Sequence, residues 1–135
     1  MNQYNKQLTR KKYCYNYDLV NQITNECCDV LEELLSELGV DYKKSHKMLF
    51  GKCPVHGGDN PTAWNIFKDG DTVRGNWVCY TKGCHKKWKN TLSGFVCGVL
   101  NRDSNRQISW WEAVLWMVEF LGYENIEDVK VKKKQ

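Results

Sequence analysis

The sequence has no apolar run long enough to cross a membrane. Its most apolar stretch, residues 113–118 with Trp110 and Trp111 nearby, is far shorter than the roughly 20 residues that a spanning helix needs. Residues 1–12 are polar and basic and have no apolar centre, so they do not resemble a secretory signal. We therefore expect a cytoplasmic protein with no membrane partner.

The chain also lacks the length of a multidomain enzyme. Its 135 residues correspond to one domain, or to a small domain with tails. With 41% hydrophobic and 13% aromatic residues, a chain of this size has enough apolar surface for a compact core. Disorder throughout is therefore excluded.

A disulfide framework is not expected either, because the seven cysteines are an odd number and no secretory signal precedes them. Thiols in a reducing compartment more often bind metal or pack in cores. Cys27 and Cys97 fall on apolar faces of expected helices, which predicts that they are core residues, whereas the pattern leaves the roles of Cys14 and Cys28 open.

Charges are segregated along the chain. Residues 1–17 carry four basic and no acidic groups, and residues 18–41 carry seven acidic and no basic groups. Residues 42–90 carry ten basic groups against three acidic ones, whereas residues 91–135 carry six of each. The positive charge of the central segment indicates a surface that contacts phosphates, although a solvated lysine-rich surface is an equal alternative.

The acidic block has the periodicity of an amphipathic helix, with apolar residues three and four positions apart. Asp18 is the expected N-cap and Gly39 the expected stop. The apolar positions are Val20, Ile23, Cys27, Val30, Leu31, Leu34, Leu35 and Leu38.

The centre of the chain has the composition of β structure. Residues 48–50 predict a short strand, and residues 62–67 and 72–80 predict a hairpin whose turn is residues 68–71. Two helices are expected after it. Residues 92–100 form the first, capped by Thr91 or Ser93, and residues 110–121 the second, with a capping-box spacing at Ser109 and Glu112 and a stop at Gly122.

Four metal-ligand residues flank the expected hairpin in two pairs. Cys53 and His56 precede it, and Cys79 and Cys84 end it. Paired ligands of this kind can wrap one structural Zn²⁺ in a tetrahedron that leaves no open position for catalysis. The sequence therefore predicts an α+β fold in which a small zinc ribbon, an antiparallel β-hairpin or sheet, is packed with flanking α-helices. Residues 1–17 would be a basic N-terminal arm, 18–122 the domain, and 123–135 a C-terminal tail or linker.

Three alternatives to this ligand set stay open. The four residues could be ordinary core residues. Cys53 and His56 could be a catalytic thiol and its base, although no third orienting group accompanies them. Finally, His85 could replace Cys84 as the fourth ligand, because the two are adjacent.

The ligand pattern and its surroundings resemble the amino-terminal zinc-binding domain of bacterial and bacteriophage DNA primases. The resemblance rests on Cys-Pro-Val-His at 53–56, Asn-Pro-Thr-Ala-Trp at 60–64, and residues 77–84 with their two cysteines. Residues 34–42 resemble the helix end, glycine and short polar stretch that precede the first cysteine there, and residues 91–100 and 109–121 resemble the two helices that follow. Four residues separate Cys79 from Cys84, where family members commonly have two.

The resemblance implies a role in DNA replication. The zinc domain of such primases binds the single-stranded DNA template and assists initiation of the RNA primer, while a separate polymerase domain, in cis or in trans, joins the ribonucleotides. A replicative helicase is a further implied partner, and the cytoplasm of a bacterium or of a phage-infected host is the implied location. This segment contains no carboxylate cluster for polymerase chemistry, since a turn explains Asp69 and Asp71 better, so no catalytic residue is expected in it.

Binding of a single strand requires cations for the backbone and aromatic faces for the bases. Residues of both kinds surround the expected metal site. Packing in the core is the stronger alternative for any one tryptophan. The candidate nucleic-acid-binding residues are Lys68, Arg74, Trp77, Lys82, His85, Lys86, Lys87 and Lys89.

Two other functions compete with template binding. A zinc-ribbon adaptor would dock another protein through the acidic helix or through the helix that carries Trp110, Trp111 and Trp116, and exposed apolar surface there would favour it. A regulator that reads duplex DNA ranks last, because the sequence contains no obvious recognition helix with basic residues.

Overall fold

The structure is a computed structural model that describes residues 16–69 and 73–130. Most of the expected basic arm, part of the expected turn at 68–71, and the lysine-rich end from residue 131 lie outside the described residues. Within the described part of the chain, no helix is long and apolar enough to cross a membrane.

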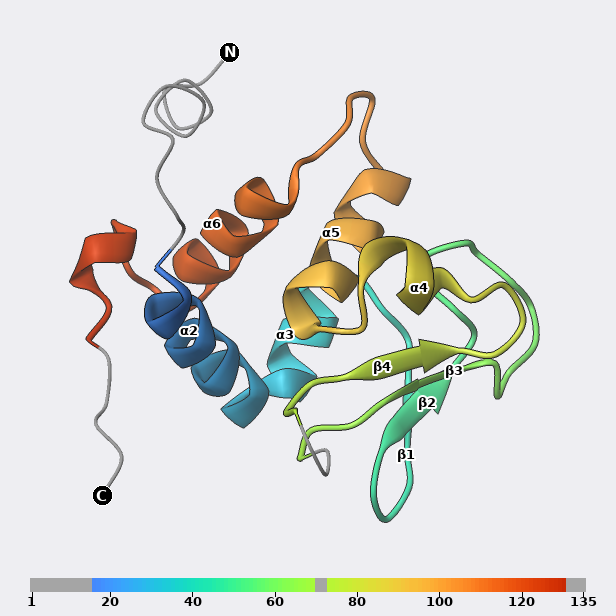
Figure 1. The fold of residues 1–135 in the computed structure, drawn as a ribbon. Coiled ribbons are helices and arrows are strands. Elements are labelled where there is room, and N and C mark those ends of the chain that lie inside the picture. The colour runs from blue at the N-terminus through green and yellow to red at the C-terminus, as the bar shows by residue number, and fades with distance from the viewer. Residues whose placement is uncertain (1–15, 70–72, 131–135) are drawn as a thin grey trace.

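Helices and a small antiparallel sheet make up the fold, which confirms the expected α+β class (Figure 1). The four strands lie in the order β1-β2-β3-β4, and each neighbouring pair is antiparallel. In chain order the elements are α2 (Tyr17–Asp29), α3 (Leu31–Glu37), β1 (Lys43–Lys44), β2 (Leu49–Gly51), β3 (Trp64–Ile66), β4 (Trp77–Cys79), α4 (Cys84–Trp88), α5 (Leu92–Arg102), α6 (Trp110–Phe120) and the 3-10 helix η1 (Ile126–Asp128).

The acidic segment forms two helices where one was expected. Its N-cap is Asn16, whose side chain accepts hydrogen bonds from the amides at positions 18 and 19. Val30 leaves the helical region, with φ −124° and ψ 39°, and separates α2 from α3. The apolar spacing continues through this break, so periodicity alone does not reveal it. The expected stop is confirmed: Gly39 has φ 73°, and the amides of Gly39 and Val40 bond back to the last turn of α3.

The buried face of the sheet packs on α5. Trp64 is opposite Cys79 and Ile66 is opposite Trp77 in the β3–β4 register, and all four side chains are buried. Phe95 of α5 stacks on Trp64 with ring centroids 5.3 Å apart and meets the ring of Trp77 edge-on at 5.2 Å. This aromatic group joins the sheet to the helices.

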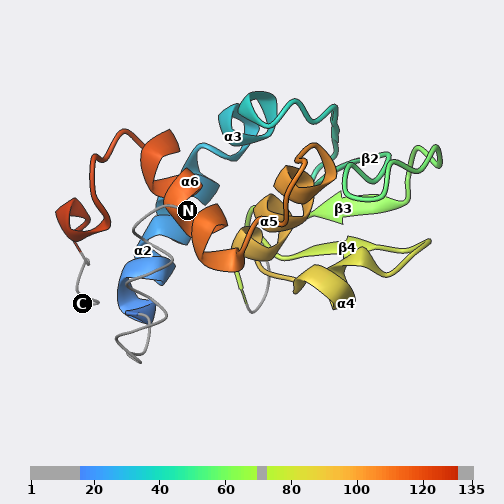
Figure 2. The same ribbon diagram turned by 90° about the horizontal axis from the view of Figure 1, so that it is seen from above.

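Helix α5 is the centre of the molecule and lies between α6 and the sheet (Figure 2). Every residue from Leu92 to Val99 is buried. Of the two expected caps, Thr91 is the one that the structure uses, since its hydroxyl accepts a hydrogen bond from the amide of Gly94. The helix that follows, α6, begins as predicted: Ser109 accepts a hydrogen bond from the amide of Glu112.

Part of the expected C-terminal tail packs on the domain. The hydroxyl of Tyr123 donates a hydrogen bond of 2.8 Å to Glu26 of α2, and Val129, just after η1, is buried in the core. The folded unit therefore continues about seven residues beyond the predicted boundary at 122. Composition alone did not show this, because the segment is short and largely polar.

Gly94 is required where α5 passes the end of α4. A Cβ at this position would collide with the carbonyl oxygens of Trp88 and Lys89. At Gly98 a Cβ would meet the side chains of Trp88 and Val55 at 3.1 Å, and side chains can move aside more easily than backbone.

We therefore expect Gly94→Ala to lower the free energy of unfolding by about 3 kcal/mol and Gly98→Ala by about 1 kcal/mol, the two ends of the range for overpacking. Urea denaturation of both variants, in buffer without chelator, measures the difference. If Gly94→Ala is no less stable than Gly98→Ala, the backbone contact does not impose the glycine.

Candidate metal centre

The sheet register brings the two predicted ligand pairs to one end of the sheet. Gly51, Trp64 and Cys79 are opposite one another across β2, β3 and β4. Cys53 comes two residues after Gly51, and Cys84 is the first residue of α4. The structure therefore places both pairs where the strands β2 and β4 end.

The ligand atoms of Cys53, His56, Cys79 and Cys84 all lie within 4.8 Å of one another. The Sγ atoms of Cys53 and Cys84 are 3.9 Å apart, and Nδ1 of His56 lies 3.2 Å from Sγ of Cys84 and 3.5 Å from Sγ of Cys79. The three cysteines are buried and the histidine is partly buried. This group could hold a metal ion.

These distances fit a tetrahedral ion. Metal–sulfur bonds of about 2.3 Å and metal–nitrogen bonds of about 2.0 Å place two sulfur ligands about 3.8 Å apart and a sulfur and a nitrogen about 3.5 Å apart. The observed separations of 3.9, 3.2 and 3.5 Å agree with that geometry. These three pairs of donor atoms already have the spacing of a coordinated ion, and the other pairs lie within 4.8 Å.

The turn after β2 places backbone N–H donors next to the sulfur of Cys53. The amides of Val55 and His56 form hydrogen bonds to Cys53, which favour its thiolate. The amide of Gly57 donates to the carbonyl of Cys53 at 3.0 Å and closes the turn. Arg102, at the end of α5, donates to the carbonyl of Pro54 at 2.8 Å and anchors this turn to the helix.

The turn after β4 likewise directs hydrogen-bond donors at the sulfur of Cys79. The amides of Lys82 and Cys84 and the hydroxyl of Thr81 form hydrogen bonds to Cys79. Gly83 adopts the left-handed conformation, with φ 65°, and its amide donates to the carbonyl of Cys79 at 3.0 Å. Both turns thus present N–H groups to a sulfur that is negatively charged when it binds metal.

The three thiols differ in acidity. Burial opposes ionisation of Cys79, but the hydrogen bonds from the backbone amides and Thr81 outweigh it and lower its pKa to about 6. Burial, together with the nearby Cys53 and Cys79, raises the pKa of Cys84 to about 12. Burial also raises the pKa of Cys53. Three thiolates at this distance repel one another, so a cation is needed for all three to ionise together.

The alternative ligand His85 has another role in the structure. Its Nδ1 accepts a hydrogen bond of 3.0 Å from the amide of Cys79, and its ring meets that of Trp77 edge-on with centroids 6.2 Å apart. The clustered ligand is Cys84. His85 therefore holds the turn in place and does not face the ion position.

The neighbouring surface is a basic hollow of about 780 Å³ around an exposed tyrosine. The side chain of Tyr80 is 68% exposed. Four of the predicted nucleic-acid-binding residues line the hollow with it: Lys82, His85, Lys86 and Lys87. Lys87 lies over the ring of Trp88, with Nζ 5.1 Å from the centroid. We call this surface the Tyr80 face.

The structure corrects the prediction for Trp77. Its side chain is 0% exposed, and its indole N–H donates to the carbonyls of Lys89 and Thr91 at 2.9 and 3.0 Å. A base therefore cannot stack on it. Tyr80, which was not selected, is exposed and lies three residues after Trp77. Strand alternation contained this signal, because Trp77 shares a face with the buried Cys79 whereas Tyr80 points the other way.

Lys68 and Arg74 lie away from this face, near the turn of the β3–β4 hairpin. Arg74 pairs with Asp29 and Asp69, each at 2.9 Å, which neutralises its charge and ties the hairpin to α2. Lys89 is exposed, but it does not line the hollow.

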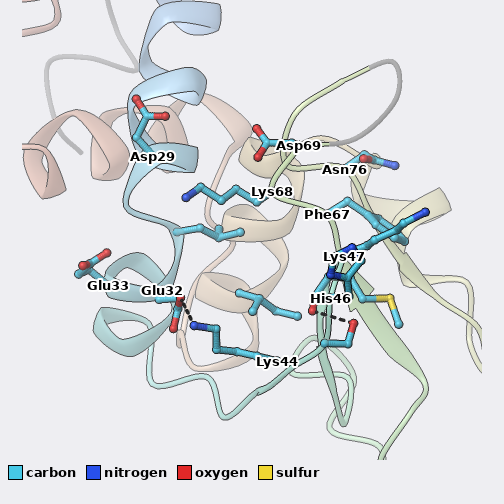
Figure 3. A pocket seen from close by; sticks show the side chains of 14 residues that line it. Asp29, Glu32, Glu33, Lys44, His46, Lys47, Phe67, Lys68, Asp69 and Asn76 are labelled. Atoms are coloured by element: carbon cyan, nitrogen blue, oxygen red, sulfur yellow. Dashed lines mark hydrogen bonds and ion pairs between the residues drawn. The ribbon is translucent and has the colours of Figure 1, made fainter.

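A second cavity, of about 1060 Å³, is lined by the end of α2, the start of α3, residues 44–49 around the β1–β2 loop, and residues 67–69 and Asn76 of the β3–β4 hairpin (Figure 3). Lys68 and Lys44 extend into it, and Lys44 pairs with Glu32 at 3.1 Å. Asp29, Glu33 and Asp69 also line it. Because carboxylates accompany the lysines here, this cavity is a poorer phosphate site than the Tyr80 face.

We expect the full chain to bind one divalent ion, and Cys84→Ala to abolish that binding because it removes a ligand. His85→Ala should keep the ion, since His85 bonds to the backbone. Metal content by mass spectrometry after dialysis, with near-ultraviolet circular dichroism as a check on folding, separates the two. Cys97→Ala, which changes a buried cysteine outside the group, is the matched control. Loss of the ion from His85→Ala but not from Cys84→Ala would reverse the assignment.

Comparisons with known proteins returned no match. No family model, curated protein or solved structure matches this chain.

Proposed function

We propose that this chain is a zinc-binding module that binds single-stranded nucleic acid, with its metal in a purely structural role. The donor set supports zinc, because three thiolates and one imidazole in a tetrahedron are typical ligands of structural zinc sites. Bound there, zinc would supply a cross-link between the two turns. Four protein ligands leave no coordination position for a substrate.

The observation that carries the proposal is that the turn which ligates the ion also presents the Tyr80 face. Tyr80 directly follows the ligand Cys79, and Lys82 lies between Cys79 and Cys84. Lys86 and Lys87 belong to α4, which begins at Cys84. An ion held by the two cysteines therefore fixes the position of the aromatic ring relative to the three lysines.

This arrangement suits an unpaired strand. The exposed ring of Tyr80 can stack on a base, an interaction worth about 1–3 kcal/mol per base, and the lysines can follow the phosphates. A base within a duplex is already stacked on both sides and does not offer its face. Single strands should therefore bind better than duplexes.

The resemblance of residues 53–64 and 77–84 to the zinc-binding domain of DNA primases supports a more specific role. In this role the chain binds the template in the cytoplasm and assists primer initiation, and a polymerase domain in cis or in trans performs the chemistry. A replicative helicase would be a further partner.

The contribution of the aromatic ring is tested at Tyr80. We expect Tyr80→Ala to weaken binding of a labelled single-stranded oligonucleotide about fivefold to a hundredfold, the equivalent of one stacked base. Tyr80→Phe should retain most of the affinity because it keeps the ring. Fluorescence anisotropy measures both, with a duplex of the same sequence as the competitor. Preference for the duplex, or equal loss in both variants, would contradict stacking on Tyr80.

The contribution of charge is tested by a triple variant, Lys82→Ala, Lys86→Ala and Lys87→Ala. Its plot of log affinity against log salt should be shallower by about 2, since each single-strand phosphate contact adds about 0.7 to the slope. The matched control replaces Lys43, Lys47 and Lys52, which are exposed on and around β1 and β2, and removes the same charge. Equal slopes for the two triples would show that only net charge matters. Binding to neither single strand nor duplex would favour the adaptor.

A further inference from the structure

An apolar groove of about 580 Å³ lies where the end of α3, the end of α5 and the outer face of α6 meet. It is separate from the Tyr80 face, since the two share no lining residue. Most of the apolar residues in its floor are half-buried. They are Leu38, Val99, Leu100, Ile108, Leu115 and Trp116.

Helix α6 supplies part of this floor, and its opposite side packs in the core. Val114 and Met117 of α6 are buried in the core, whereas Leu115 and Trp116 are only partly buried and line the groove. The ring of Trp116 stacks on that of Phe120, one turn further along, with centroids 5.6 Å apart and planes 3° from parallel. The indole is therefore held in place as part of a preformed wall.

Carboxylates surround this apolar floor. Glu37, Asp103 and Glu119 line the groove and are exposed, and none of them forms an ion pair with another described residue. The only basic residue among those that line the groove in the described structure is Arg106, which bonds to both carboxylate oxygens of Glu112 at 3.2 and 3.0 Å. The groove therefore carries uncompensated negative charge.

An apolar floor bordered by carboxylates favours some classes of macromolecule over others as the ligand of the groove. The carboxylates repel the phosphates of nucleic acids and of anionic lipids, whereas lysine and arginine side chains complement them. The apolar floor favours a ligand with an apolar stripe, and an amphipathic helix presents such a stripe next to its charges. We propose that this groove docks a lysine- or arginine-rich amphipathic helix of a partner protein.

Binding in this groove does not depend on nucleic-acid binding. The residues of the groove belong to α3 and its C-terminal end, to α5, to α6 and to the loop before α6, and none of them is a candidate metal ligand. The Tyr80 face is basic and the groove is acidic, so a strand and a basic helix would not compete for one surface. The chain could hold both at once.

Two synthetic peptides test the charge preference. Both are 18-residue helices with leucine on one face, and the polar positions are lysine in one and glutamate in the other. Anisotropy titration of the labelled peptides with the full chain, purified without chelator, should show binding of the lysine peptide and none of the glutamate peptide. The affinity should fall as salt rises, because exposed charges are screened.

Charge reversal then locates the binding. The groove variant is Glu37→Lys, Asp103→Lys and Glu119→Lys, and the matched control is Asp41→Lys, Glu124→Lys and Glu127→Lys, which reverses as many exposed carboxylates outside the groove. We expect the groove variant to weaken the lysine peptide about tenfold or more, because it places like charges together, and the control to weaken it less than about twofold. Circular dichroism and metal content confirm that both variants are folded.

Shift changes in the nuclear magnetic resonance spectrum of the labelled chain give a second measurement. With the lysine peptide they should cluster on residues 37–38, 99–108 and 112–119. The proposal is overturned if neither peptide binds, if the two triple variants lose equal affinity, or if the changes lie elsewhere. A dimer in analytical ultracentrifugation that the groove variant dissociates would also overturn it, since a second copy would then be the occupant.

Discussion

The structure depends on the convergence of four ligand atoms that belong to two separate turns. Neither turn can position its ligands alone: the pairing of β2 with β3 and of β3 with β4 brings the ends of β2 and β4 together. These three strands have only three residues each, and sheets this small are marginal without further support. An ion bound by all four residues would supply that support, and its binding energy would then be folding energy.

Much of this arrangement could be predicted because its signals are local. Cys53 with His56 and Cys79 with Cys84 are pairs close in sequence, and the segment between them alternates as a hairpin does. The fold class, the ligand set and the starts of α5 and α6 followed from such patterns. Adjacency could not decide between Cys84 and His85. The decision depends on α4, a five-residue helix that is too short for its periodicity to be seen, and on the hydrogen bond that the amide of Cys79 donates to His85.

The features that the sequence did not reveal have different causes. The break at Val30 interrupts no apolar pattern, and the packing of Tyr123 on Glu26 joins residues 97 positions apart. The burial of Trp77 is a different case, because strand alternation placed it on the side of Cys79. The aromatic content of the segment suggested base stacking, but the exposed aromatic residue of this segment is Tyr80, on the opposite side of the strand.

The candidate metal centre and the Tyr80 face share the turn that follows β4. For the base stacking that we propose for Tyr80, the ring contributes most when its position is fixed before the nucleic acid binds, because ordering a flexible loop on binding costs free energy. Here Tyr80 directly follows the candidate ligand Cys79, and the α4 lysines follow the candidate ligand Cys84. The hydrogen bond between His85 and the Cys79 amide and that between the Trp77 indole and the Lys89 carbonyl hold the same turn from inside the molecule. Trp77, which is buried, and His85, which bonds to the backbone of Cys79, thus hold the Tyr80 face in position.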